Sequence, residues 1–131
     1  MAEIVRGPST SKVQKKENLY SVGEVCRLTG TTRKTLFYYD RIGLLPPSRR
    51  EGAQNFKEYD SGKVQRLRMI IEYREAGLRI TEIREMLDDK EAEKIRILKG
   101  ALQRLKNERS DTEEKVRRIQ LLIKEETERK G

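Results

Sequence analysis

Residues 20–43 read YSVGEVCRLTGTTRKTLFYYDRIG, and this stretch decides the fold. Ser21 and Glu24 have the spacing of a capping box, in which a serine oxygen accepts a backbone N–H and a glutamate reaches back to the helix start. Apolar residues then recur at helical spacing as far as Leu28, and Gly30 follows as a stop signal. The pattern predicts a short helix that begins near Ser21 and ends at Gly30.

A second helix follows almost at once. Thr31 and Thr32 can cap its start with their hydroxyl groups, and Leu36 and the aromatic run at 37–39 lie within it before the chain turns at 40–43. Two short helices around a turn of three or four residues that contains a glycine are typical of a helix-turn-helix. Because this unit is used to read DNA, its second helix is the first candidate for a binding element.

A small β-hairpin is predicted next. Pro46 and Pro47 cannot continue a helix, and residues 48–59 read SRREGAQNFKEY. Gly52 and Asn55 tolerate the positive φ that a tight loop needs, and the short flanks on either side can pair as strands. We expect this hairpin to form a wing beside the helix-turn-helix.

Two further helices are expected between Asp60 and residue 88. Asp60 can cap the first, which runs to about Ala76 and is ended by Gly77. The second covers about 80–88, with Arg79 where a capping serine or threonine is usual. The residues expected to be buried are Val64, Leu67 and Ile71 in the first helix and Ile80, Ile83 and Leu87 in the second.

From Glu91 onward the sequence predicts one long helix. Its apolar residues alternate at spacings of three and four, which is the heptad pattern of a coiled coil. A helix of ~35 residues is ~50 Å long, too long for one small domain to cover, so a partner helix is implied. The expected dimerisation residues are Ile95, Leu98, Leu102, Leu105, Thr112, Val116, Ile119 and Ile123. Arg109 and Thr112 interrupt the pattern, either to fix the register or as a tolerated weak point.

The composition fits a small core with a long solvated helix. Charged residues make up 40% of the 131 and hydrophobic residues 34%, and the formal net charge is +8. Residues 1–50 carry 10 basic and 4 acidic side chains, so the basic excess lies mainly in this N-terminal part. A polyanionic partner is implied, either nucleic acid or an acidic membrane. Residues 1–18 are expected to be a disordered tail that either touches phosphates or is inert.

Several classes of protein are disfavoured. The chain has no histidine, and Cys26 is its one cysteine, so an intrachain disulfide and a histidine-containing metal site are impossible. No catalytic constellation, apolar span or secretory leader is visible, so we expect a cytoplasmic protein that is not an enzyme and needs no cofactor. Cys26 is expected to be a small buried hydrophobe, with redox sensing as the alternative.

The second helix and the hairpin carry the candidate contacts to DNA. Arg33 and Lys34 in the first turn oppose the helix dipole, a cost that a nearby phosphate or guanine offsets. One ring of the pair Tyr38 and Tyr39 is expected in the core, and the other at a phosphate. The basic hairpin residues either bind DNA or protect an exposed strand edge. The expected DNA-binding residues are Ser21, Thr32, Arg33, Lys34, Tyr38, Tyr39, Arg49, Arg50, Asn55 and Lys57.

Residues 20–89 resemble the MerR family of bacterial transcription regulators. The segments that carry the resemblance are YSVGEV at 20–25, LTG at 28–30, TLFYYD at 35–40, GLL at 43–45 with PSR at 47–49, NFKEY at 55–59, and EAG at 75–77 with Ile80, Ile83 and Leu87. The resemblance implies a mainly α fold: a winged helix-turn-helix with a small β-hairpin wing, a second helix pair, and a long C-terminal helix in an antiparallel coiled coil. It divides the chain into a tail at 1–18, a DNA-binding domain at 19–89 and a dimerisation helix at 90–131.

The resemblance also implies a mechanism. Such homodimers bind a palindromic operator in an over-long promoter spacer, and they distort the DNA so that RNA polymerase engages both promoter boxes. The place of action implied is the bacterial nucleoid. The family usually has arginine where Phe37 stands and glycine where Asn55 stands. No cysteine follows Cys26, so no sensed metal is inferred. The competing hypotheses are an architectural DNA binder and an adaptor whose basic face binds an acidic protein.

Overall fold

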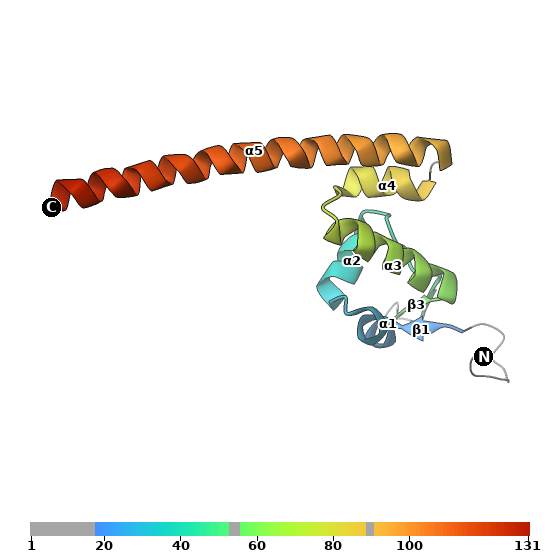
Figure 1. Cartoon of the computed structure of the whole chain (residues 1–131). Coiled ribbons are helices and arrows are strands. Elements are labelled where there is room, and N and C mark those ends of the chain that lie inside the picture. Colours follow the sequence, from blue (N-terminus) through green and yellow to red (C-terminus); the bar gives the residue numbers. More distant parts are fainter. Residues whose placement is uncertain (1–17, 53–55, 89–90) are drawn as a thin grey trace, which may run out of the picture. The chain divides into compact units, whose positions relative to one another are not determined.

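A computed structural model describes residues 18–52, 56–88 and 91–131 of the chain. These residues form two compact units, divided between residues 72 and 73, and each is described by itself. Figure 1 shows the elements in chain order, the long last helix among them. They are β1 (Tyr20–Ser21), α1 (Val22–Thr29), α2 (Arg33–Arg41), β2 (Arg49–Glu51), β3 (Phe56–Tyr59), α3 (Ser61–Glu75), α4 (Ile80–Asp88) and α5 (Glu91–Lys130). The expected mainly α fold with a hairpin wing is confirmed.

The caps that frame α1 are those expected from the sequence. The Glu24 backbone N–H donates to Ser21 Oγ at 3.2 Å, and the Ser21 N–H donates to Glu24 Oε1 at 2.8 Å, so the capping box is complete. Gly30 ends the helix with φ +78°, a left-handed conformation that glycine adopts without strain. Its N–H donates to the Cys26 carbonyl at 2.8 Å.

The turn between α1 and α2 is short because a new cap follows directly. Thr32 has extended backbone angles, and its Oγ1 accepts the Thr35 N–H at 3.1 Å. Thr29 Oγ1 also bonds Thr31 Oγ1 at 3.0 Å across the turn. The two helices are therefore fixed to each other by local hydrogen bonds, as a helix-turn-helix requires.

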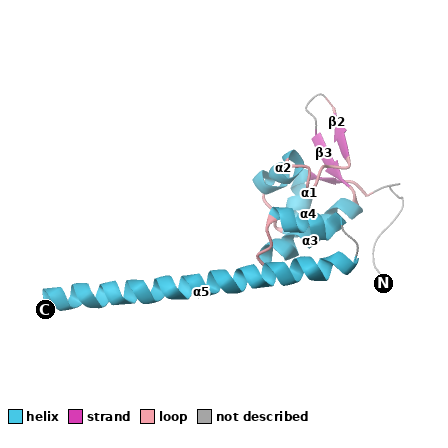
Figure 2. Cartoon of the chain, turned by 90° about the horizontal axis from the view of Figure 1, so that it is seen from above, coloured by secondary structure: helices cyan, strands magenta, loops and turns pink. Residues whose placement is uncertain are grey.

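The strands form an antiparallel sheet in the order β1–β3–β2. Arg49, Arg50 and Glu51 pair with Glu58, Lys57 and Phe56, which confirms the expected hairpin. Figure 2 shows β2 and β3 side by side at one end of the unit that also holds α1 and α2. The sequence analysis missed β1, in which Tyr20 pairs with Tyr59, because two residues are too few to show an alternating pattern.

The core of the first unit gathers around two leucines that follow α2. Leu44 and Leu45 are fully buried, as are Leu36, Tyr59 and Leu67. Asp60 caps α3 as expected, because its Oδ1 accepts the Lys63 N–H at 2.9 Å. The expected face of α3 needs one correction. Ile70 is fully buried, whereas Ile71 is only half-buried, so the buried face turns one residue earlier than the spacing suggested.

In the second unit α4 packs against the first turns of α5, and Figure 1 shows them side by side. Ile83 and Met86 are the buried residues of α4, while Ile80 and Leu87 are half-buried, so that expectation was wrong in part. On α5, Ile97 is 5% exposed and Ala101 2% exposed. The start of α4 is capped by Glu82, whose Oε1 accepts the Arg79 N–H at 2.7 Å, in place of the missing serine or threonine.

Candidate nucleic-acid interface

The first turn of α2 presents two cations to solvent. Arg33 and Lys34 are exposed, and α2 has no acidic residue in its first turn. Within the described ranges neither cation forms an ion pair. A Cβ built on Gly23 would lie 3.5 Å from Arg33 Nη2, so the guanidinium rests close to the backbone of α1. Exposed cations and orphan N–H groups at one helix start can meet base edges and phosphates.

The two tyrosines of α2 occupy different environments. Tyr39 is 7% exposed and belongs to the core, whereas Tyr38 is 39% exposed. Their ring centroids lie 5.9 Å apart, and the Arg41 guanidinium lies 5.3 Å from the Tyr38 ring centroid. Tyr38 is therefore the member of the pair whose hydroxyl group has access to a partner in solution.

A carboxylate at the end of α2 joins this helix to the wing. Asp40 Oδ1 accepts from Arg50 Nη2 at 2.8 Å, and Asp40 Oδ2 accepts from Arg50 Nη1 at 3.0 Å. Lys57 Nζ lies 2.9 Å from Asp40 Oδ2. The hydrogen bonds from Arg50, and then those from Lys57, hold the pKa of Asp40 below its ordinary 3.8, although burial opposes them. One residue of β2 and one of β3 are thus tied to the same carboxylate.

Phe37, the aromatic residue before the two tyrosines, helps to hold Lys57 beside Asp40. Lys57 Nζ lies 4.1 Å from the centroid of the Phe37 ring, a cation–π distance. On the outer strand Arg49 pairs with Glu51 and, at 3.4 Å, with Glu58 Oε1. The wing cations are therefore held by groups of the protein, and they lie on the same unit as the exposed cations of α2.

A profile described as a MerR HTH family regulatory protein matches residues 20–90. The chain belongs to the MerR family. The match spans more than half of the chain and includes the capped turn, α2 and the wing.

Relatives are named for transcription. The chain is 43% identical over 74 residues to the "HTH-type transcriptional activator TipA" of Streptomyces coelicolor, over 56% of this chain and 29% of that protein. It is 39% identical over 69 residues to the "HTH-type transcriptional activator mta" of Bacillus subtilis, over 53% of this chain and 26% of that protein. The chain thus spans less than a third of the length of either relative. Both relatives are thus named as activators of transcription.

Solved structures share the fold. MtaN, the N-terminal part of the Bacillus subtilis multidrug transporter activator, is 29% identical with a TM-score of 0.68, over 79% of this chain and 97% of that one. EcmrR in its complex with DNA is 24% identical with a TM-score of 0.75, over 83% of this chain and 40% of that one. HiNmlR, a regulator "lacking the sensor domain" and bound to promoter DNA, is 17% identical with a TM-score of 0.54, over 76% of this chain and 79% of that one. The last two show the fold alone.

The expected site residues of this MerR-family chain divide into four groups. Thr32 caps α2, and Arg33, Lys34 and Tyr38 lie on this helix, while Arg49, Arg50 and Lys57 lie on the hairpin and contact acidic groups. Ser21 and Tyr39 have structural roles, in the capping box and in the core. Asn55 lies outside the described residues.

The sequence analysis missed Asp40 as the residue that unites this surface. A signal was available, because a carboxylate in the last turn of a helix opposes the helix dipole and therefore calls for a cation nearby. The sequence analysis likewise assigned no contact to Phe37, which stands where the family usually has arginine. In the structure its ring lies beside Lys57.

Among residues 18–52, 56–88 and 91–131, no helix combines the length and hydropathy that a membrane span needs. Over the same ranges, no group of three or more acidic or thiol side chains is arranged to hold a metal ion. Cys26 is half-buried in α1.

Proposed function

We propose that the chain is a homodimeric transcription regulator that binds a palindromic operator within a promoter spacer. One observation carries this proposal: the exposed first turn of α2, with Arg33 and Lys34, lies in the same compact unit as a wing that carries Arg49, Arg50 and Lys57, in a MerR-family chain. In a helix-turn-helix the N-terminal residues of the second helix enter the major groove. Arg33 would then read a guanine and Lys34 would contact a base or phosphate.

The remaining contacts position the protein on the DNA backbone. Tyr38 contacts a DNA phosphate through its hydroxyl group. Thr32, at the start of α2, lies beside the same DNA strand. On the wing, Arg49 has a half-exposed side chain that can exchange its carboxylate partners for a phosphate. Arg50 and Lys57 hold the wing against α2 and add to the positive potential of the surface.

Dimerisation follows from the unpaired seam of α5. Its apolar residues remain 42–60% exposed at Ile95, Leu98 and Leu102 and 47–59% exposed at Val116, Ile119 and Ile123. A second α5 in antiparallel orientation would cover them, and Leu105 and Thr112 complete the seam. The two-fold symmetry of such a dimer matches an inverted repeat in the DNA.

The proposed mode of action is DNA distortion. Bending and untwisting an over-long spacer costs a few kcal/mol, which phosphate contacts along both subunits offset. RNA polymerase then engages both promoter boxes. The proposed place of action is the nucleoid of a bacterial cytoplasm. The structure of EcmrR with DNA was determined within the EcmrR-RPo assembly, which is a precedent for such a partner in that protein.

The test is selection of bound duplexes from fragmented genomic DNA at near-physiological salt. The proposal expects an inverted repeat that lies between promoter boxes, and the variant Arg33→Ala/Lys34→Ala should lose it. The matched control Arg118→Ala/Lys124→Ala removes two exposed cations from α5 and should retain it. DNA without a shared motif would favour the architectural binder. If the α2 variant binds DNA as well as the wild type, the basic face serves a protein partner instead.

A further inference from the structure

The long helix α5 has two apolar faces, and only one of them is covered. Ile97 and Ala101 are buried against α4, whereas the seam residues on the adjoining face remain exposed. Leu105 lies where the faces meet, because it is half-buried and its side chain would lie 3.4 Å from a Cβ on Gly77. The seam is therefore an unpartnered strip along a helix whose rotation about its own axis is already fixed by α4.

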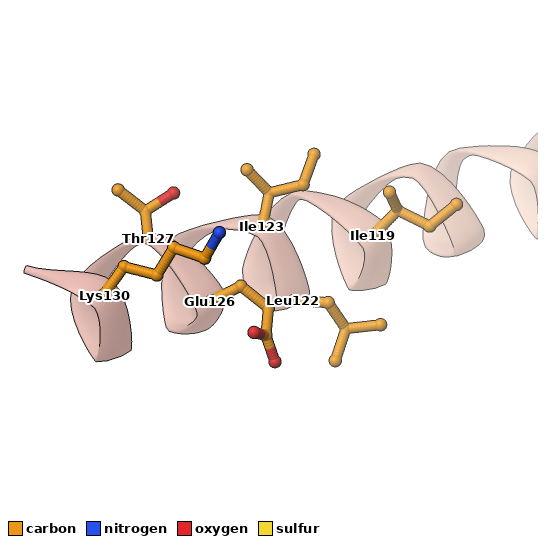
Figure 3. A pocket seen from close by; sticks show the side chains of 6 residues that line it. All are labelled: Ile119, Leu122, Ile123, Glu126, Thr127 and Lys130. Atoms are coloured by element: carbon orange, nitrogen blue, oxygen red, sulfur yellow. The ribbon is translucent and has the colours of Figure 1, made fainter.

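A hollow of about 350 Å³ lies on the last turns of this strip. Ile119, Leu122, Ile123 and Glu126 line it, with Thr127 and Lys130 at one end (Figure 3). The first four have the spacing i, i+3, i+4 and i+7. This is the arrangement of four residues that forms a hole for one side chain of a partner helix in a coiled coil.

The charges along α5 disfavour a parallel partner. In a parallel pair identical seam positions meet, so Arg109 would face Arg109 at the centre of the interface. Glu108 would also face Glu113 along the flank of the seam, which adds two repulsive contacts. An antiparallel partner avoids both conflicts.

We propose that a second copy of this chain inserts its Leu98 into the hollow, in an antiparallel register whose two-fold axis passes between Ser110 and Asp111. The inference rests on the dimer of the proposed function and specifies its register. Each seam residue from Leu98 to Ile123 then has one counterpart in the seam, while Ile95 comes opposite Glu126, and the register is fixed by four pairs. They are Leu98 with Ile123, Leu102 with Ile119, Leu105 with Val116, and Arg109 with Thr112.

This register separates the apolar layers from the polar ones. Three apolar pairs lie on each side of the axis, and the polar side chains of Arg109 and Thr112 meet each other at the centre. Leu122 comes opposite Ala101, which has a small side chain already packed on α4. Moving the axis half a heptad earlier would place Leu105 opposite Arg109, and moving it half a heptad later would place Ile119 opposite Arg109. Either shift would therefore replace an apolar layer on each side of the axis by a contact with a charged side chain.

The flanking charges select the same register. Lys106 comes opposite Glu113 and Glu108 opposite Lys115, and symmetry repeats both contacts. All four side chains are exposed on α5. With the axis half a heptad earlier, Lys106 would face Lys106 and Glu108 would face Glu108. With the axis half a heptad later, Glu113 would face Glu113 and Lys115 would face Lys115. Like charges at these positions decide partner choice and alignment.

Paired cysteines test the register directly in the full chain, with Cys26→Ser as background. Leu98→Cys/Ile123→Cys should form a disulfide-linked dimer on mild oxidation, whereas each single variant should not. An intrachain bond is impossible, because 25 residues of straight helix separate the two positions by about 37 Å. Leu98→Cys/Val116→Cys is the matched control, since those residues meet only if the axis lies half a heptad earlier.

Charge reversal tests the register without altering the apolar seam. Lys106→Glu should raise the dissociation constant of the dimer about tenfold. The reason is that both symmetric contacts between residue 106 and Glu113 then join two glutamates. The double variant Lys106→Glu/Glu113→Lys should restore the affinity, and Lys124→Glu, on the outer face of α5, should leave it unchanged. Sedimentation equilibrium at low salt measures all three.

The outcomes separate the register from the dimer. A monomeric wild type at micromolar concentration would overturn both this inference and the dimer of the proposed function. A dimer that cross-links through 98 and 116, or through neither pair, overturns the register alone. Cross-linking through 98 and 123, together with rescue by the double charge reversal, supports it.

Discussion

Asp40 holds Arg50 through two parallel hydrogen bonds, of 2.8 and 3.0 Å, between a helix end and a strand ten residues further along the chain. The Asp40 side chain is 9% exposed, whereas that of Arg50 is 42% exposed. The carboxylate is thus the buried partner, and the guanidinium lies at the surface. Because Lys57 reaches the same carboxylate, one acidic group links both wing strands to the end of α2.

Replacing Asp40 by asparagine should lower the melting temperature by roughly 2–6 °C. The amide keeps the shape but cannot neutralise the two cations that remain beside it. Thermal unfolding followed by circular dichroism measures the effect. Glu72→Gln, which removes an exposed carboxylate from α3, is the control and should leave the melting temperature unchanged. Equal melting of the Asp40 variant and the wild type would show that the contact does not stabilise the fold.

The difference in stability between the wild type and Asp40→Asn should become smaller in acid. The pKa of Asp40 is depressed in the folded state, so its contribution is present above the ordinary value of 3.8 and is lost as the pH falls through the lower folded value. Urea unfolding of the wild type and of Asp40→Asn, measured from pH 6 to pH 3, should show a difference that shrinks towards the acid end. A difference that does not change with pH would mean that the charge of Asp40 is irrelevant.

Tyr59 should make the protein sensitive to alkali. Burial, and then the charge of Asp40, raises the pKa of its hydroxyl group to about 12 from 10.0. Between these values the unfolded chain loses the proton first, so stability falls as the pH rises through this window. Tyr59→Phe should abolish that fall, and Tyr73→Phe should not. At pH 7 the Tyr59 variant should be as stable as the wild type or up to about 1 kcal/mol more stable, because the buried hydroxyl has no hydrogen-bond partner among the described residues.

Lys34 and Arg33 should differ in how they affect DNA binding. If Lys34 contacts phosphate, Lys34→Ala should weaken binding to all duplexes alike and reduce the slope of log affinity against log salt by about 1. If Arg33 reads a base, Arg33→Ala should cost about 1–3 kcal/mol on the operator and relax the sequence preference at one position. Affinity titrations at several salt concentrations, on operator and scrambled duplexes, distinguish the two effects.

Two glycines should respond in opposite directions to alanine. Gly30 has φ +78° and no atom within 4 Å of an added Cβ, so Gly30→Ala should cost about 1 kcal/mol from backbone strain alone. Gly100 lies inside α5 with equally open surroundings, so Gly100→Ala should stabilise the helix by about 1 kcal/mol. Chemical denaturation compares both variants with the wild type. A stabilising change at Gly30 would contradict its role as the cap of α1.

The features that could be predicted from the sequence are those set by neighbouring residues. The capping box of Ser21 and Glu24 and the Thr32 cap involve atoms within three residues of each other, so the motif alone defines the geometry. The wing hairpin follows from turn residues and flanking strands in the same way. The seam of α5 is periodic over several turns, which makes its spacing visible despite the polar residues at its centre.

The features that were missed depend on contacts between distant elements. Met86, Ile97 and Ala101 become buried because α4 lies on one side of α5, and no local pattern says on which side. Tyr20 forms a strand only because Tyr59 is available to pair with it. The link from Asp40 to the wing likewise depends on tertiary structure, so the candidate cations were found while the group that positions them was not.

The contacts of Arg104 with Gly77 and Glu82 fix the rotation of α5 about its own axis. Its Nη2 donates to Glu82 Oε1 at 2.7 Å and to the Gly77 carbonyl at 3.3 Å. Each residue added to a helix turns the following side chains by about 100°. One extra residue after Leu105 would therefore swing Val116 and Ile119 away from the line of Leu98 and Leu102, whereas seven extra residues would bring them back to within about 20°. An insertion between Leu105 and Val116 thus keeps α4 and the seam on their present faces only if its length is close to a whole number of helical turns, as a heptad is.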